Sequence, residues 1–196
     1  MRVNVKQIDG EWDLGFVLDQ HSNVSVQNGH HANGHAKYDT DYTEVGEMVH
    51  QFKYRSDFSH VPALAKAVNA HLVPKLGNID LVVPMAPSRT RKAQPVTTLA
   101  KYLAKVMEVP VELDFLVKRP GSPSLKDIET RWAKEQALKG TLSLARDLKG
   151  DGRFDILLLD DLFDTGASLD AACKVLRKCE KIGAIYVAAL TWTRNS

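Results

Sequence analysis

The chain has 196 residues, 44% hydrophobic and 26% charged, and its 26 Lys and Arg against 24 Asp and Glu leave a net charge of +2. This length and composition are typical of a globular protein with one full α/β domain and at most a small additional part. The small net charge argues against nucleic acid as a partner, and no apolar run approaches the roughly 20 residues of a membrane span. Since the N-terminus has no signal-peptide core, we expect a cytoplasmic protein without a membrane partner.

The N-terminal region is predicted to form hairpins. An extended pattern on both sides of the turn dipeptide Asp9-Gly10 predicts a β-hairpin over residues 2–21. Residues 22–42 are rich in Asn, Gly and His and suit loops or a second short hairpin. We therefore divide the chain into an N-terminal region, 1–42, and an α/β domain, 43–196.

From residue 43 onward, helical and extended patterns alternate. Helical segments show apolar residues every three or four positions, and strand segments are short aliphatic runs. The alternation predicts a doubly wound, mainly parallel α/β sheet that binds its ligand at the carboxyl ends of its strands. Helices are predicted over 43–55, 60–72, 96–107 and 128–138 and after residue 168, and strands over 79–83, 109–117, 155–159 and 184–190.

The most informative segment runs from Ile156 to Leu169. Four aliphatic residues lead into Asp160 and Asp161, and a loop of small residues from Asp164 then opens an amphipathic helix. The unpaired N–H groups and positive dipole at a helix start suit a phosphate. The two carboxylates can accept hydrogen bonds from vicinal hydroxyls of a sugar. The segment therefore predicts a site for a ribose 5-phosphate.

A basic loop, residues 84–92, follows the predicted strand at 79–83 and carries three cations but no glycine. The lack of glycine disfavours a Rossmann-type dinucleotide turn, as in a dehydrogenase or methyltransferase. Cations and hydroxyls at a strand's carboxyl end instead suit a polyanion such as pyrophosphate.

The segment 156–169 resembles the phosphoribosyl pyrophosphate (PRPP) signature of type I phosphoribosyltransferases. The order of segments over 43–194 is most similar to the ComF-like members of that family. Gly46–Tyr54 resembles their "Leu-Lys-Tyr" segment, Asp80–Pro84 their "Asp-x-Ile-Val-Pro" strand, and Lys118-Arg119-Pro120 their basic flexible segment.

Three features depart from the ComF-like pattern. The four-cysteine zinc module is absent, and the hairpin region stands in its place. Arg91–Pro95 replaces the family's Arg-Gly-Phe-Asn-Gln run. Asp164 stands where these proteins have Thr, as it does in purine phosphoribosyltransferases.

The resemblance implies transfer of a phosphoribosyl group from PRPP to a small-molecule acceptor, a purine or pyrimidine base by default, with release of pyrophosphate. It implies a place in nucleotide metabolism and Mg²⁺ as a cofactor held by substrate oxygens and waters more than by protein. The expected catalytic residues are Asp160 and Asp161, which would orient the ribose and offset charge at its anomeric carbon, and Asp164, which would accept a proton. The remaining expected PRPP-binding residues are Thr165, Gly166, Ala167, Ser168 and Leu169, and those for pyrophosphate are Ser88, Arg89, Arg91, Lys118 and Arg119.

Acceptor choice in this superfamily depends on a variable hood, which here would be the N-terminal hairpin region. Trp12 or Trp192 could stack on a base, although each residue suits a structural position as well. Homodimer formation is left open.

Three alternatives compete with this interpretation. A PRPP- or nucleotide-binding regulator without transfer chemistry would use the same residues. Asp164-Thr165-Gly166 also matches the aspartic-protease signature, but that loop belongs to an all-β fold and continues into a strand, whereas a helical pattern follows here. In an ordinary strand–loop–helix connection, Asp164 would serve as the N-cap of the helix.

Overall fold

A five-stranded sheet forms the centre of the computed structural model, which describes residues 1–30, 36–87, 93–122, 128 and 130–193. The strand order is β1-β2-β9-β8-β5. The four strands from β2 to β5 in this order are mutually parallel, and β1 adds an antiparallel edge. Their bounds are β1 Lys6–Ile8, β2 Leu14–Gln20, β9 Ile182–Trp192, β8 Phe154–Phe163 and β5 Leu81–Pro84. The predicted α/β class with a mainly parallel sheet is confirmed.

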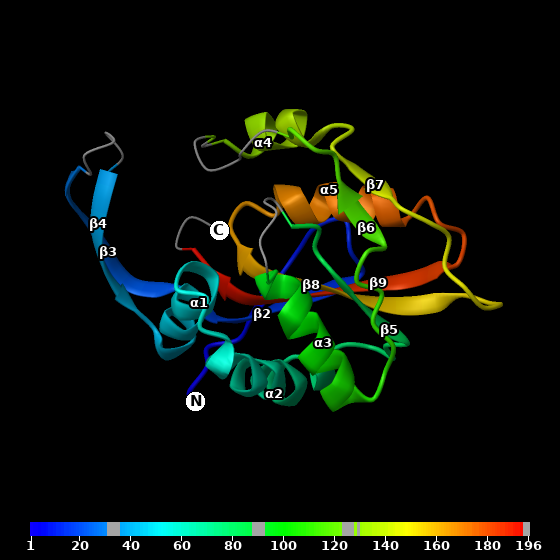
Figure 1. The fold of residues 1–196 in the computed structure, drawn as a ribbon, viewed down its shortest axis with the longest axis horizontal. Coiled ribbons are helices and arrows are strands. Elements are labelled where there is room, and N and C mark those ends of the chain that lie inside the picture. Colours follow the sequence, from blue (N-terminus) through cyan, green and yellow to red (C-terminus); the bar gives the residue numbers. More distant parts are fainter. Residues whose placement is uncertain (31–35, 88–92, 123–127, 129, 194–196) are drawn as a thin grey trace.

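Helices cover both faces of this sheet (Figure 1). Helices α1, α2 and α3 lie on one face, and α5, with α4 beyond it, lies on the other. Their bounds are α1 Glu44–Tyr54, α2 Val61–His71, α3 Pro95–Met107, α4 Arg131–Leu138 and α5 Ala167–Leu176, and short 3-10 helices span Phe58–His60 and Val73–Lys75. The helices predicted at 43–55, 60–72, 96–107 and 128–138 correspond to α1 to α4. None of the described helices is both long enough and apolar enough to cross a membrane.

The aliphatic run of β8 explains the two-sided core. Successive side chains of a strand point to opposite faces. Leu157 and Leu159 accordingly pack with α1 to α3, while Ile156 and Leu158 pack toward α5, and all four are fully buried. A strand covered on both faces needs such an uninterrupted run, because a polar residue on either side would be desolvated.

Two small sheets lie outside the central one. Strands β3 (Ser22–His30) and β4 (Ala36–Tyr42) form a hairpin that stands away from the sheet beside α1 (Figure 1). Strands β6 (Leu116–Lys118) and β7 (Leu142–Leu144) form the other pair. The first N-terminal hairpin, β1–β2, belongs to the central sheet, whereas β3 and β4 of the N-terminal region lie outside it.

The strand predicted over 109–117 is wrong for most of its length. Pro110 has no N–H to donate, and the chain makes only an isolated bridge between Val82 and Val111 before it turns. Only residues 116–118 are extended, as β6, and they pair with β7 away from the central sheet. The apolar residues of this segment had suggested a longer strand, but they serve the core instead: Val109 and Val111 pack against one side of it, and Phe115 and Leu116 are buried in the other.

Candidate functional site

A cavity of about 1010 Å³ opens at the carboxyl ends of the parallel strands. Its walls come from the ends of β5 and β8, from Thr193 just after β9, from the start of α3 and from α4. The ligand-binding edge expected of a parallel sheet therefore coincides with a large hollow. The structure brings the eight residues expected to bind PRPP together in its wall: Asp160, Asp161, Asp164, Thr165, Gly166, Ala167, Ser168 and Leu169.

The two adjacent acids lie within β8, which continues to Phe163, and not after its end at residue 159 as predicted. Their side chains therefore leave the strand in opposite directions. The backbone N–H of Asp161 donates to Oδ1 of Asp160 over 2.8 Å. Burial raises the pKa of Asp160 to about 7, and the neighbouring charge of Asp161 adds to the effect.

Asp161 is bound by a lysine that the sequence analysis gave no role. The ammonium of Lys53, on α1, lies 2.9 Å from Oδ1 of Asp161, and both side chains are mostly buried. Burial opposes the charge of Lys53, but the carboxylate of Asp161 outweighs it and raises the pKa of the lysine. Burial, together with the charge of Lys53, lowers the pKa of nearby His21. The pair thus holds one acid neutralised inside the cavity wall.

The loop after β8 turns into α5 at Gly166, which has φ of 79° and is the N-cap of the helix. A side chain here would be strained by the left-handed backbone, and its Cβ would lie 3.2 Å from Phe163. Because the first-turn N–H groups of a helix have no helical acceptors, those of Ala167, Ser168 and Leu169 are placed to bind an anion. The alternative in which Asp164 is the N-cap is therefore wrong.

Asp164 is instead held by two side chains from distant segments. Its Oδ2 accepts from the ammonium of Lys134, on α4, and its Oδ1 accepts from the hydroxyl of Thr193 over 3.1 Å. Lys134 was not predicted as a site residue, because lysines are usually solvated. The sequence feature that could have revealed it is its spacing from Leu138. The two residues are four positions apart, so Lys134 lies on the buried face of α4.

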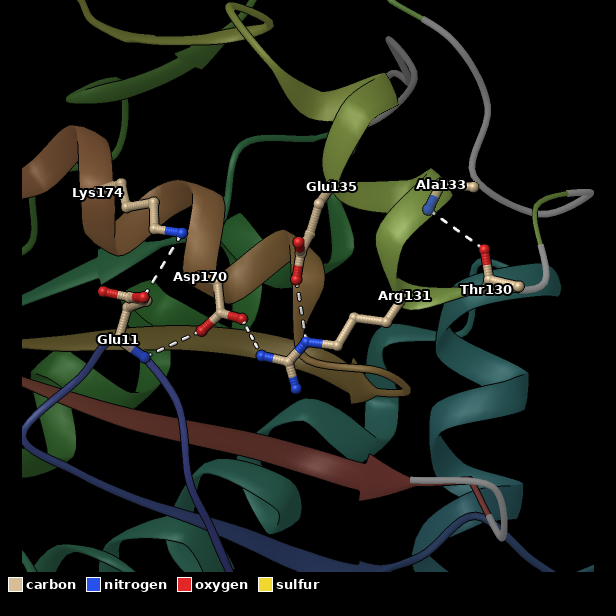
Figure 2. A network of polar contacts seen from close by, with 7 residues as sticks. All are labelled: Glu11, Thr130, Arg131, Ala133, Glu135, Asp170 and Lys174. Atoms are coloured by element: carbon tan, nitrogen blue, oxygen red, sulfur yellow. Dashed lines mark hydrogen bonds and ion pairs between the residues drawn. The ribbon is translucent and has the colours of Figure 1, made fainter.

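Helix α4 is also tied to α5 and to the N-terminal loop (Figure 2). The buried carboxylate of Asp170 binds the guanidinium of Arg131 and accepts from the backbone N–H of Glu11 over 2.9 Å. Arg131 also pairs with Glu135 at 3.1 Å, and Thr130 caps the helix by accepting from the N–H of Ala133. These contacts fix the helix that carries Lys134.

The residues predicted to bind pyrophosphate do not all lie in the described part of the cavity wall. Lys118 lines the cavity, and burial lowers its pKa. Arg119 is exposed and is not among the described residues of the cavity wall. Ser88, Arg89 and Arg91 lie outside the described residues.

The aromatic residues of the cavity are not those considered from sequence. Trp12 and Trp192 are both buried in the core, where the indole N–H of Trp12 donates to the carbonyl of Ile8 over 3.0 Å. The cavity is lined instead by Tyr38 of β4 and Tyr54 of α1. Sequence periodicity could not reveal this, because both tyrosines lie on the exposed faces of their elements.

The loop that contains Asp164-Thr165-Gly166 leads into α5 within an α/β fold. An aspartic protease needs an all-β setting for this loop, so the protease alternative is contradicted. Within the described part of the chain, no group of three or more His, Cys, Asp or Glu side chains is arranged to hold a metal ion.

No family model and no curated protein matches the chain, but solved structures do. Adenine phosphoribosyltransferase from Trypanosoma brucei, solved with AMP, pyrophosphate and ribose 5-phosphate, matches 98% of this chain and 76% of its own, with a TM-score of 0.54 and 15% identity. The Saccharomyces cerevisiae adenine phosphoribosyltransferase matches 85% and 84%, with a TM-score of 0.46 and 15% identity.

A hypoxanthine phosphoribosyltransferase from Staphylococcus aureus matches 69% of this chain at 17% identity and a TM-score of 0.45, and the chain spans 64% of that enzyme's length. At these identities the similarity shows the fold alone, and of these three enzymes the one from Trypanosoma brucei has a TM-score above 0.5. The chain has the type I phosphoribosyltransferase fold.

Proposed function

We propose that the protein transfers a phosphoribosyl group from PRPP to a ring nitrogen of a purine or pyrimidine base and releases pyrophosphate. The observation that supports this most is the convergence, in one cavity at the carboxyl end of a type I phosphoribosyltransferase sheet, of three acids, a helix-opening loop and three lysines. The lysines are Lys53, Lys118 and Lys134. Such a mixed lining suits a ligand with both hydroxyls and phosphates.

The 5-phosphate would bind the loop from Thr165 to Leu169. The first-turn N–H groups of α5 and the hydroxyls of Thr165 and Ser168 are the donors there. Pyrophosphate would lie nearer Lys118, with Ser88, Arg89, Arg91 and Arg119 as further candidates.

Asp160 and Asp161 would accept hydrogen bonds from the ribose hydroxyls. Their charge would offset the positive charge that develops at the anomeric carbon. Carboxylate oxygens also fit the ligand preference of Mg²⁺, which when bound with PRPP would offset the charge of the leaving pyrophosphate.

In the transfer step, the bond between the anomeric carbon and the pyrophosphate oxygen breaks, and its electron pair leaves with pyrophosphate. The lone pair of the acceptor nitrogen forms the new bond. The proton of that nitrogen passes to the carboxylate of Asp164, the residue directly before the loop 165–169.

The acceptor would lie between β4 and α1, where Tyr38 and Tyr54 offer ring faces to a base. In this arrangement the β3–β4 hairpin is the hood. A cytoplasmic location and homodimer formation remain predictions.

A second candidate, a PRPP-binding regulator without transfer chemistry as in ComF-like relatives, has one observation in its favour. Two of the three acids, Asp161 and Asp164, are already paired with lysines. Their ion pairs would leave less free carboxylate for chemistry.

Two measurements test these proposals together. PRPP with Mg²⁺ should raise the melting temperature, because a ligand at 100 times its dissociation constant adds about 2.7 kcal/mol to the free energy of unfolding. Pyrophosphate release should then be assayed with a panel of purine and pyrimidine bases. Release with one base supports transfer, a melting shift without release supports the regulator, and no shift at millimolar PRPP rejects both.

A further inference from the structure

Lys134 is a buried lysine in a cavity wall. The residue is 8% exposed, and its ammonium donates to Oδ2 of Asp164. Among the described residues, Asp164 is the one acceptor recorded for this ammonium, although an ammonium carries three N–H donors. Burying a cation is costly unless its donors are satisfied. The remaining donor capacity of Lys134 is therefore available beside the cavity that it lines.

The position of Lys134 also resolves an electrostatic conflict. Asp164 has a 40% exposed side chain next to a loop suited to an anion, and its negative charge would oppose that anion. Lys134 brings a positive charge to the same point, so the pair is neutral. Thr193 holds the other oxygen of Asp164 and keeps the carboxylate turned toward the lysine.

We propose that Lys134 is a further ligand of the anion bound at the loop 165–169, and that Asp164 holds its ammonium in place until the anion arrives. This inference rests on the phosphate site of the proposed function. The ammonium keeps one hydrogen bond to Asp164 and gives another to a phosphate oxygen. No covalent bond is made or broken. The lysine raises the affinity for the anion without taking part in the transfer step.

Helix α4 holds Lys134 in position before the anion binds. Arg131, one turn before Lys134, is fixed to Asp170 of α5, the helix whose N-terminus faces the same anion (Figure 2). This ion pair joins the helix that carries Lys134 to the helix that begins at the phosphate loop. A cation positioned before binding loses little conformational freedom when the ligand arrives.

The test is calorimetric titration of four variants with ribose 5-phosphate. Lys134→Gln should bind roughly 10- to 100-fold more weakly than the parent, the range expected for loss of a hydrogen bond to a charged group. Lys139→Gln, which removes an exposed lysine just beyond the same helix, should stay within about threefold. Asp164→Asn should bind about threefold or more tightly, because it removes a like charge beside the anion while its amide oxygen can still accept from the ammonium. The double variant Lys134→Gln/Asp164→Asn should bind at least roughly tenfold more weakly than Asp164→Asn alone.

The outcomes separate this inference from the proposed function. A folded Lys134→Gln with unchanged affinity overturns it, as does a double variant equal to Asp164→Asn, because Lys134 would then only support Asp164. If Lys134→Gln does not fold, an Asp164→Asn variant that binds no more tightly overturns it. A parent that binds ribose 5-phosphate but transfers to no base overturns only the catalytic proposal, whereas a parent that binds neither ribose 5-phosphate nor inorganic phosphate overturns both.

Discussion

The ammonium of Lys53 lies 2.9 Å from Oδ1 of Asp161, although the two residues are 108 positions apart in the chain. This ion pair joins α1 to the end of β8 inside the cavity wall. The Asp161 side chain is 12% exposed and that of Lys53 is 22% exposed. The pair therefore links the stability of the fold to the charge state of the site.

We expect Lys53→Met to lower the free energy of unfolding by about 1–3 kcal/mol, less than for a fully buried pair because water still reaches both groups. Without Lys53, the mostly buried carboxylate of Asp161 would lose the ion pair that compensates its burial. Urea unfolding at neutral pH measures this loss. Lys66→Met, at an exposed position on α2, is the control and should change little. A loss no larger than that of Lys66→Met would count against the pair.

Asp160 should make stability fall as pH rises. Its folded pKa is raised to about 7 by burial, whereas the unfolded carboxyl titrates near 3.8. Between these values the folded state binds more protons than the unfolded state, so raising the pH removes stability. Asp160→Asn should therefore be more stable than the parent at pH 8, on the order of 2 kcal/mol after allowance for partial exposure. The difference should shrink toward pH 5, and thermal unfolding across this range that shows a constant difference would contradict the prediction.

Asp164→Asn should lower turnover by roughly 10²-fold or more without weakening PRPP binding, because the amide cannot accept the proton of the acceptor nitrogen. The amide oxygen can still accept from Lys134 and Thr193. Thr193→Val is the matched variant, since it removes one contact to the same carboxylate but leaves the base, and should cost less. Pyrophosphate release with the best base of the panel gives both values. Unchanged turnover in folded Asp164→Asn would remove this residue from catalysis.

The network of Figure 2 offers a comparison of a buried and an exposed ion pair. Arg131→Met leaves the buried carboxylate of Asp170 with the N–H of Glu11 as its remaining recorded partner within the described residues, so we expect a loss of about 1–3 kcal/mol. Lys174→Met breaks the exposed pair with Glu11, 3.5 Å long, and should cost less than about 0.5 kcal/mol. Urea unfolding of both variants tests this, and a larger loss for Lys174→Met would reverse the assignment.

Local sequence determined most of the secondary structure and the motif. Thr43 and Arg55 are the N-cap and C-cap of α1, and the helix lies where the periodic spacing of its apolar residues predicted it. The run Ile156–Leu159 identified a strand buried on both faces, and the residues after it identified the loop at the start of α5. These signals are periodicities and turn residues within about fifteen positions, so they can be read without tertiary contacts.

The tertiary structure decided what surrounds the motif. A pattern shows that a residue is polar, but not which distant residue it meets, and Lys53 and Lys134 reach Asp161 and Asp164 only because α1 and α4 pack against the same end of the sheet. Likewise, the segment around Val111 has strand-like composition but makes only an isolated bridge beside β5. Hydrophobic and helical periods are local properties of a chain, whereas ion pairs, cavity walls and sheet edges depend on the packing of several elements at once.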